Sequence, residues 1–332
     1  MRLPRMHRGS LAVTTVITAV LALTAAGCGG GGGDNKPSSS GTGPEKTTLN
    51  IGLLPVGDLA QFQLAQDRGF FKAEGLTVKT QMLQGGAEAV PKLKSKNLDI
   101  SAGAWEPAFA AQGSGAVKLH AVAPAFNSGP GTHVIMVPKN SPIKTVQDLV
   151  GKKIGINVKH NLGSLMIQAT LQPRGVKLDD EKNFVAIPFP NMLAALKSGS
   201  VDAVQAVEPV ATQLQQAIGA RLLIDLSQGP TASFPIAGYF STEEFAKENP
   251  KTIAAFQRAI VKAQALLTDK SLAAKVIPEY TKITPQIAAA MHYGSYPTSV
   301  NAADLKRVSD LMIQYKYLAT PIDVNAFVGN AG

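Results

Sequence analysis

The stretch Leu93-Lys94-Ser95-Lys96-Asn97-Leu98-Asp99-Ile100 has a second copy in this chain of 332 residues. A shift of 103 positions brings it onto Leu196-Lys197-Ser198-Gly199-Ser200-Val201-Asp202-Ala203. The same shift carries Ile51-Gly52-Leu53 onto Ile154-Gly155-Ile156. Because separate segments agree in one register, the sequence predicts two lobes of one design.

Each copy has the pattern of an amphipathic helix, a short turn and a buried strand. The strands run on to Trp105-Glu106-Pro107 in the first copy and to Val207-Glu208-Pro209 in the second. Proline cannot continue a central strand, so both acids are expected at the carboxyl ends of strands. Ligands bind at that edge of open α/β sheets. Two such edges facing each other would form a cleft.

Strands alternate with helices along most of the chain, which predicts parallel-rich sheets flanked by helices. We expect the first lobe at residues 47–135 and the second at 136–236. Residues 237–332, with helices at the C-terminus, are expected to return to the first lobe. Gly129-Pro130 and Gly229-Pro230 each precede an apolar strand, at 133–137 and 234–240. We interpret these two segments as the two crossings of a hinge.

The N-terminus has the pattern of an export signal. Basic residues, an apolar run from Leu11 to Leu23 and small residues up to Gly27 predict a lipoprotein signal peptide at residues 1–27. Cys28 would then carry the lipid, and residues 28–46, rich in Gly, Ser and Pro, would form a flexible tether. The alternative is an ordinary signal peptide in which Cys28 is incidental.

Composition and motifs exclude several classes of function. The formal net charge is +9, but no basic run is interleaved with aromatic residues, so nucleic-acid binding is not expected. The single cysteine offers neither a disulfide nor a zinc site. The motifs of serine hydrolases, zinc proteases and P-loop proteins are missing from the sequence. We therefore predict no catalytic residues, no metal and no cofactor.

The sequence resembles one family over about residues 47 to 320. The resemblance is carried mainly by Gly69-Phe70-Phe71-Lys72-Ala73-Glu74-Gly75-Leu76, together with Gly151-Lys152-Lys153-Ile154-Gly155 and Glu208-Pro209. The family comprises the solute-binding proteins of ABC importers for nitrate, sulfonate, taurine and thiamine-type pyrimidines. The resemblance implies the type II periplasmic-binding-protein fold, in which two lobes close over one solute. It also implies a monomer outside the cytoplasm that docks on a membrane permease.

The candidate ligand-binding residues lie at strand ends, helix starts and crossings. Trp105 would stack on a ligand, and Asp58, Glu106 and Glu208 would accept hydrogen bonds from an amine or heterocycle. The turn at Asn161, Gly163 and Ser164 opens a helix, where backbone N–H groups favour anions. The full set comprises Asp58, Gly85, Gly86, Trp105, Glu106, Asn127, Asn161, Gly163, Ser164, Glu208 and Phe234.

Each candidate also has an ordinary structural interpretation. Trp105 and Phe234 would be core packing, the acids would be solvated or ion-paired, and Asn161 and Ser164 would be helix caps. A lone histidine is more often structural, so His133 is not included. Acids and an aromatic ring near the rims, with few cations, favour a zwitterion or a neutral heterocycle over an oxyanion.

These observations favour a lipid-anchored protein that delivers a small organic solute to an ABC importer. The solute would be a sulfonate, taurine, nitrate or a thiamine-pyrimidine-like compound. Two alternatives stay open. One is an enzyme on the same scaffold, related to thiamine-pyrimidine synthesis, and the other is a solute sensor that serves no permease.

Overall fold

The computed structural model describes residues 43–329, which form one compact unit. The expected signal peptide, Cys28 and most of the expected tether lie outside the described residues. The last tether residues belong to the folded body. The Glu45 carboxylate accepts hydrogen bonds from the N–H groups of Lys251 and Thr252, and the Lys46 ammonium lies 2.8 Å from Asp99 Oδ1.

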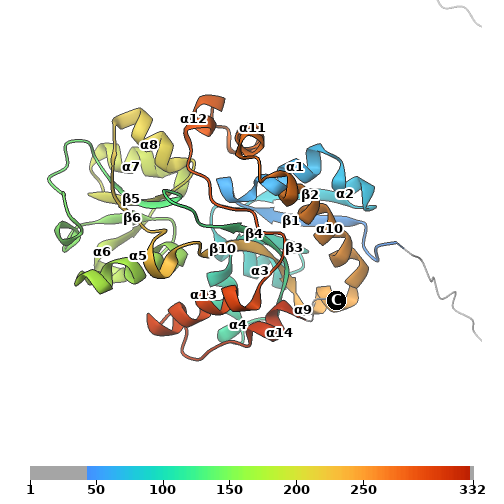
Figure 1. The fold of residues 1–332 in the computed structure, drawn as a ribbon. Helices are drawn as coiled ribbons and strands as arrows, with labels where there is room; N and C mark the ends of the chain where they lie inside the picture. The colour runs from blue at the N-terminus through green and yellow to red at the C-terminus, as the bar shows by residue number, and fades with distance from the viewer. Residues whose placement is uncertain (1–42, 330–332) are drawn as a thin grey trace, which may run out of the picture. The chain divides into compact units, whose positions relative to one another are not determined.

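Two five-stranded sheets organise the fold (Figure 1). The first has the strand order β2-β1-β3-β10-β4 and the second has the order β7-β6-β8-β5-β9. The first sheet contains β1 (Thr48–Leu53), β2 (Thr77–Met82), β3 (Ile100–Ala104), β4 (Leu119–Asn127) and β10 (Pro235–Thr242). The second contains β5 (His133–Val137), β6 (Ile154–Ile156), β7 (Phe184–Ala186), β8 (Ala203–Val207) and β9 (Arg221–Asp225).

Each sheet is parallel except for one strand. β10 pairs antiparallel with β3 and β4, and β5 pairs antiparallel with β8 and β9. These are the two strands that follow the crossings. The first crossing spans residues 128–132 and the second spans 226–234, a few residues before each expected lobe boundary. The crossings are bonded together, because the Ser128 N–H donates to the Phe234 carbonyl at 2.8 Å and Phe234 N–H donates to Ser128 Oγ at 2.9 Å.

Helices cover both sheets. Those between the strands are α1 (Ala60–Asp67), α2 (Phe70–Ala73), α3 (Ala89–Lys94), α4 (Trp105–Gly113), α5 (Leu162–Leu171), α6 (Asp180–Asn183), α7 (Met192–Ser198) and α8 (Val210–Ile218). Those after β10 are α9 (Glu243–Glu248), α10 (Pro250–Leu266), α11 (Lys270–Thr281), α12 (Pro285–Ala290), α13 (Ala302–Gln314) and α14 (Val324–Val328). Residues 43–329 contain no helix that combines the length and the apolar character needed to cross a bilayer.

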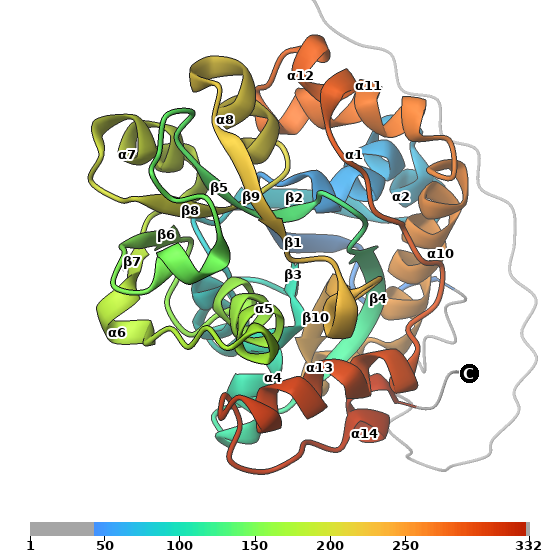
Figure 2. The same cartoon turned by 60° about the vertical axis from the view of Figure 1, so that its left-hand side comes forward.

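The C-terminal helices return to the first lobe, and they also reach the second. α10 packs on α1 and α2, and α14 packs on β4. At one end α12 meets α8, and at the other end α13 meets α5 (Figure 2). The chain after β10 therefore contacts the second lobe at two places besides the crossings.

Candidate functional site

A cavity of about 320 Å³ lies between the two lobes, at the carboxyl ends of β1, β3, β6 and β8. The first lobe contributes the loop after β1, the start of α3 and the first turns of α4. The second contributes the loop from Asn157 to Gly163, Phe189 and the end of β8. Both antiparallel strands also reach it, through His133 on β5 and Ile236 and Ala237 on β10. Small-molecule sites of α/β proteins occupy this position.

Most of the wall is apolar, which suits the body of a small organic molecule. The large apolar side chains in it come from both lobes and are Leu54, Val56, Leu59, Val90, Val158, Leu162, Phe189, Val207 and Ile236. A few polar groups interrupt this surface.

Glu106 is one of these polar groups. It lies in the first turn of α4, its side chain is 3% exposed, and its Oε2 has no hydrogen-bond partner among the described residues. Burial raises the pKa of Glu106 to about 8, although the backbone N–H of Leu162 opposes the rise. Leu162 is the first residue of α5, so this acid of the first lobe faces the start of a helix in the second.

Asp58 is the second acid on the cavity wall, in the loop after β1. Burial raises its pKa to about 7. Two tyrosines pack beside it: Tyr280 donates its hydroxyl to the Val56 carbonyl, and Tyr296 donates to the Gly57 carbonyl. The first lobe therefore presents two carboxyl groups to the cavity.

The second sheet contributes His133 and Gln205. Burial lowers the pKa of His133 to about 4, although the Asp225 carboxylate opposes the change, so the imidazole is neutral at pH 7. The Gln205 side chain is 1% exposed, and its Nε2 has no partner among the described residues. Its Oε1 lies over Gly163, where an added Cβ would be 2.5 Å away. Glycine at this position lets the helix start approach Gln205.

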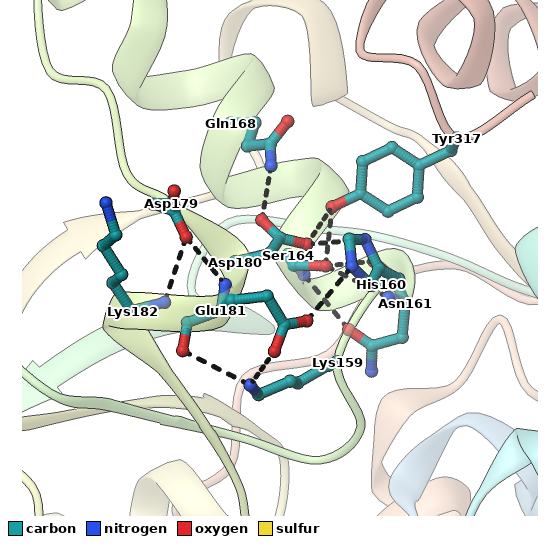
Figure 3. A network of polar contacts seen from close by, with 10 residues as sticks. All are labelled: Lys159, His160, Asn161, Ser164, Gln168, Asp179, Asp180, Glu181, Lys182 and Tyr317. Atoms are coloured by element: carbon teal, nitrogen blue, oxygen red, sulfur yellow. Dashed lines mark hydrogen bonds and ion pairs between the residues drawn. The ribbon is translucent and has the colours of Figure 1, made fainter.

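The start of α5 is fixed by a polar network at the edge of the cavity (Figure 3). Asn161 Oδ1 accepts from the Ser164 N–H at 3.1 Å, and Ser164 Oγ accepts from the Asn161 N–H at 3.0 Å. Tyr317, which follows α13, donates its hydroxyl to Ser164 Oγ at 2.7 Å. His160 pairs with Asp180 at 3.0 Å, and Lys159 pairs with Glu181 at 2.7 Å. The network joins the C-terminal segment to the second lobe.

The structure brings five of the sequence-derived candidates together on the cavity wall, namely Asp58, Gly86, Glu106, Asn161 and Gly163. The other six do not line it: Gly85, Trp105, Asn127, Ser164, Glu208 and Phe234. Ser164 is held in the network just described. Gly85 lies where the lobes meet, because a Cβ there would be 3.2 Å from Asn157 Oδ1 and from a Val158 methyl group.

Trp105 faces the core of the first lobe, in contrast to the stacking role expected from the sequence. Its ring is 2% exposed and meets Phe327 edge-on, with centroids 5.8 Å apart. It also packs beside Phe240 and over Gly238 of β10. Trp105 and Glu106 are neighbours at a helix start, so their side chains leave in different directions.

Glu208 also differs from the expectation, because its carboxylate is already occupied. It accepts from the N–H and hydroxyl of Thr212, one helical turn later, and from the N–H of His292. Its carbonyl accepts from the Gly57 N–H at 3.2 Å. Glu208 thus connects the second lobe to two segments of the first.

The two remaining candidates lie at the crossings. The backbone of Asn127 pairs with Ser295. Phe234 is fully buried beneath the Arg307 guanidinium, whose carbon lies 5.6 Å from the ring centroid. The Phe234 side chain therefore serves packing at the hinge.

Sequence reasoning missed His133 and Gln205 as cavity residues. A signal for Gln205 was present, because it is a lone polar residue inside the apolar strand Ala203–Val207. A buried polar side chain needs a partner, and such a residue often faces a site. His133 opens β5 in the same way, with a polar side chain at the head of an apolar strand.

The fold and the cavity define a class of protein: two mixed α/β lobes, joined by two crossings, with a solute-sized cavity between them. The alkanesulfonate-binding protein SsuA from Xanthomonas axonopodis pv. citri, bound to MOPS, has this fold, with a TM-score of 0.73. The alignment has 21% identity and covers 86% of this chain and 99% of that one. Residues 42–278 match the NMT1-like family, and the chain belongs to this family.

Relatives with assigned names cover more than one activity. A nitrate import ATP-binding protein, NrtC, from Synechocystis sp. is 23% identical over 76% of this chain and 40% of the relative. This chain thus spans less than half the length of that protein. A 4-amino-5-hydroxymethyl-2-methylpyrimidine phosphate synthase from Saccharomyces cerevisiae is 28% identical over 76% of this chain and 75% of its own length. Within residues 43–329, no cluster of three or more His, Cys, Asp or Glu residues is placed to hold a metal ion.

Proposed function

We propose that this protein captures a small organic solute between its lobes and delivers it to an ABC importer. The observation that carries the proposal is the cavity, whose wall is built by both lobes at the carboxyl ends of their strands. A solute there would contact both lobes at once, and the two crossings would let the lobes close over it. The names of the relatives supply solute classes to test: sulfonates, nitrate and the thiamine pyrimidine.

Solute binding is expected to close the lobes and to stabilise the fold. Small-angle scattering should show a smaller radius of gyration with a bound solute, and the melting temperature should rise with solute concentration. The panel should contain taurine, an alkanesulfonate, nitrate and the thiamine pyrimidine. A compound that stabilises the protein but leaves the scattering curve unchanged would rule out closure as the mechanism.

An enzyme on the same scaffold is the second candidate, because the yeast relative is named a synthase. The two functions differ in what happens to the bound molecule. A binding protein should return every solute unchanged after release, whereas an enzyme should yield a product. Mass spectrometry of the released material distinguishes them.

The proposal includes anchoring through lipid on Cys28. The Cys28→Ala variant should move from the membrane fraction to the soluble fraction, because it loses the thiol that would carry the acyl chains. A Gly29→Ala variant keeps that thiol and should stay with the membrane. Fractionation followed by immunoblotting measures both, and equal retention of the two variants would contradict the anchor.

A further inference from the structure

Charge on the cavity wall is unevenly distributed. The two acids, Asp58 and Glu106, both come from the first lobe. The Lys159 ammonium is engaged by Glu181, and His160 is engaged by Asp180 at the edge. His133 is buried and neutral. The titratable groups left to meet a solute are therefore the carboxyl groups of Asp58 and Glu106.

The position of Glu106 indicates that its Oε2 atom can accept a hydrogen bond from a bound solute. Its Oε2 is buried and unpartnered within residues 43–329, which is costly unless a bound molecule supplies a hydrogen bond. Nearby polar groups have other partners. The Tyr317 hydroxyl donates to Ser164 and lies 3.3 Å from Asp180 Oδ2, and Tyr280 and Tyr296 donate to backbone carbonyls beside Asp58.

We propose, on the basis of the solute-binding function above, that the solute carries a positively charged nitrogen group bound by Glu106, with the Asp58 carboxyl group as a second acidic site on the same cavity wall. An amidinium, a guanidinium or an ammonium group supplies a donor for Glu106 Oε2, which has no partner within residues 43–329. The apolar wall around the two acids holds a compact hydrocarbon or aromatic body. Gln205 Nε2, on the opposite lobe, is left to donate to an oxygen or ring nitrogen of the same molecule.

An oxyanion would find Lys159 and His160 on this wall already paired with acids. A sulfonate or nitrate would lie beside two carboxyl groups and would be repelled once they ionise, so its affinity would fall as pH rises. A cation has the opposite requirement, because it binds best when both groups are ionised. Since burial raises the pKa of Asp58 to about 7 and of Glu106 to about 8, a cation must displace protons as it binds near neutral pH. Its affinity therefore rises with pH.

Three compounds of nearly the same shape test the sign of the charge: benzamidine as the cation, benzamide as the neutral form and benzenesulfonate as the anion. Calorimetric titration from pH 6 to 9 should show that benzamidine binds most tightly. Its affinity should increase by about tenfold or more between pH 6 and pH 8, because each displaced proton changes affinity up to about tenfold per pH unit. Amidinium charge is constant over this range, so the change reports on the protein.

Variants assign the effect to the acids. Glu106→Gln should weaken benzamidine binding about tenfold or more at pH 8, flatten its pH dependence and leave benzamide binding nearly unchanged. Asp58→Asn should act in the same direction. Asp67→Asn, which removes an exposed acid of the same lobe, should change neither the affinity for benzamidine nor its pH dependence. Circular dichroism melting of each variant confirms that it is folded.

The outcomes separate this inference from the function on which it rests. Tighter binding of benzenesulfonate or nitrate than of benzamidine would keep the solute-binding function and overturn the cationic solute. Equal binding of benzamide and benzamidine would also overturn the cationic solute. So would an affinity for benzamidine that does not change, or decreases, as pH rises. If neither benzamidine nor any of the sulfonate, nitrate and pyrimidine probes binds, the solute-binding function itself is contradicted.

Discussion

Replacing Gly238 by alanine is expected to destabilise the first lobe by about 3 kcal/mol or more. Gly238 lies in β10, and a Cβ there would overlap ring atoms Cζ2 and Cη2 of Trp105. The ring has little room to move, because Phe240 and Phe327 pack against it. Relief would require a shift of the α4 start, where Glu106 also lies. Chemical denaturation followed by circular dichroism measures the change.

Gly103 provides the matched control for this substitution. It is the register partner of Gly238 on the neighbouring strand β3, and a Cβ there would meet only Phe240 Cε1 at 3.9 Å. Gly103→Ala should therefore change the free energy of unfolding by less than about 1 kcal/mol. Similar losses in the two variants would mean that strand backbone freedom, and not the Trp105 ring, sets the requirement for glycine at position 238.

The internal repeat is the reason that so much of the fold could be predicted from the sequence. Hydrophobic periodicity located the strand at 133–137 at its observed bounds, and the repeat placed β3 and β8 at matching positions. These features depend on neighbouring residues, which a sequence pattern records. The insertion of β5 and β10 as antiparallel strands depends on pairing between distant segments, which the pattern does not record.

The site was harder to predict, because a motif gives a position in the chain and not a side-chain direction. Glu106 and Glu208 occupy the same motif, yet only Glu106 lines the cavity. Glu208 turns to Thr212 and to His292, a residue of the returning C-terminal segment. No residue near Glu208 in the sequence indicates that His292 would be its partner. The direction of the Trp105 side chain likewise depends on packing against Phe327, which is more than two hundred residues away in the sequence.

The stability of the solute-free protein is expected to fall as pH rises from about 4.5 to 8, with Glu106 as the main cause. Burial raises the pKa of Glu106 from 4.5 to about 8, so across this interval the folded state holds a proton that the unfolded state releases. Stability decreases with pH wherever the folded state binds more protons. The contribution is present below pH 4.5 and is lost as pH rises through about 8. Asp58 acts in the same direction between about 3.8 and 7.

Other groups titrate in overlapping intervals. His133 and His120, whose pKa values are lowered by burial, act against this trend, and Glu279, whose pKa is raised by burial, acts with it. Burial lowers the pKa of His133 from 6.5 to about 4, so its effect is a loss of stability as pH falls from 6.5 towards 4. The pKa of Asp148 is lowered by hydrogen bonds from the Lys144 and Thr145 N–H groups, so it matters only at more acidic pH. A comparison of wild type with one variant isolates Glu106 from these groups.

Glu106→Gln is that variant, since it keeps the side-chain shape and removes the ionisation. The stability of wild type relative to the variant should fall by at most about 1.4 kcal/mol for each pH unit, with the steepest change between about pH 5 and 7. Urea unfolding at several pH values measures this difference, and Glu248→Gln, which changes an exposed acid of the first lobe, should follow the wild-type curve. Above pH 8 the variant should be the more stable protein, because it no longer buries a carboxylate without a partner. A difference that stays constant across the interval would show that Glu106 is ionised in the folded protein at acidic pH, and the proton displacement proposed for cation binding would then be lost.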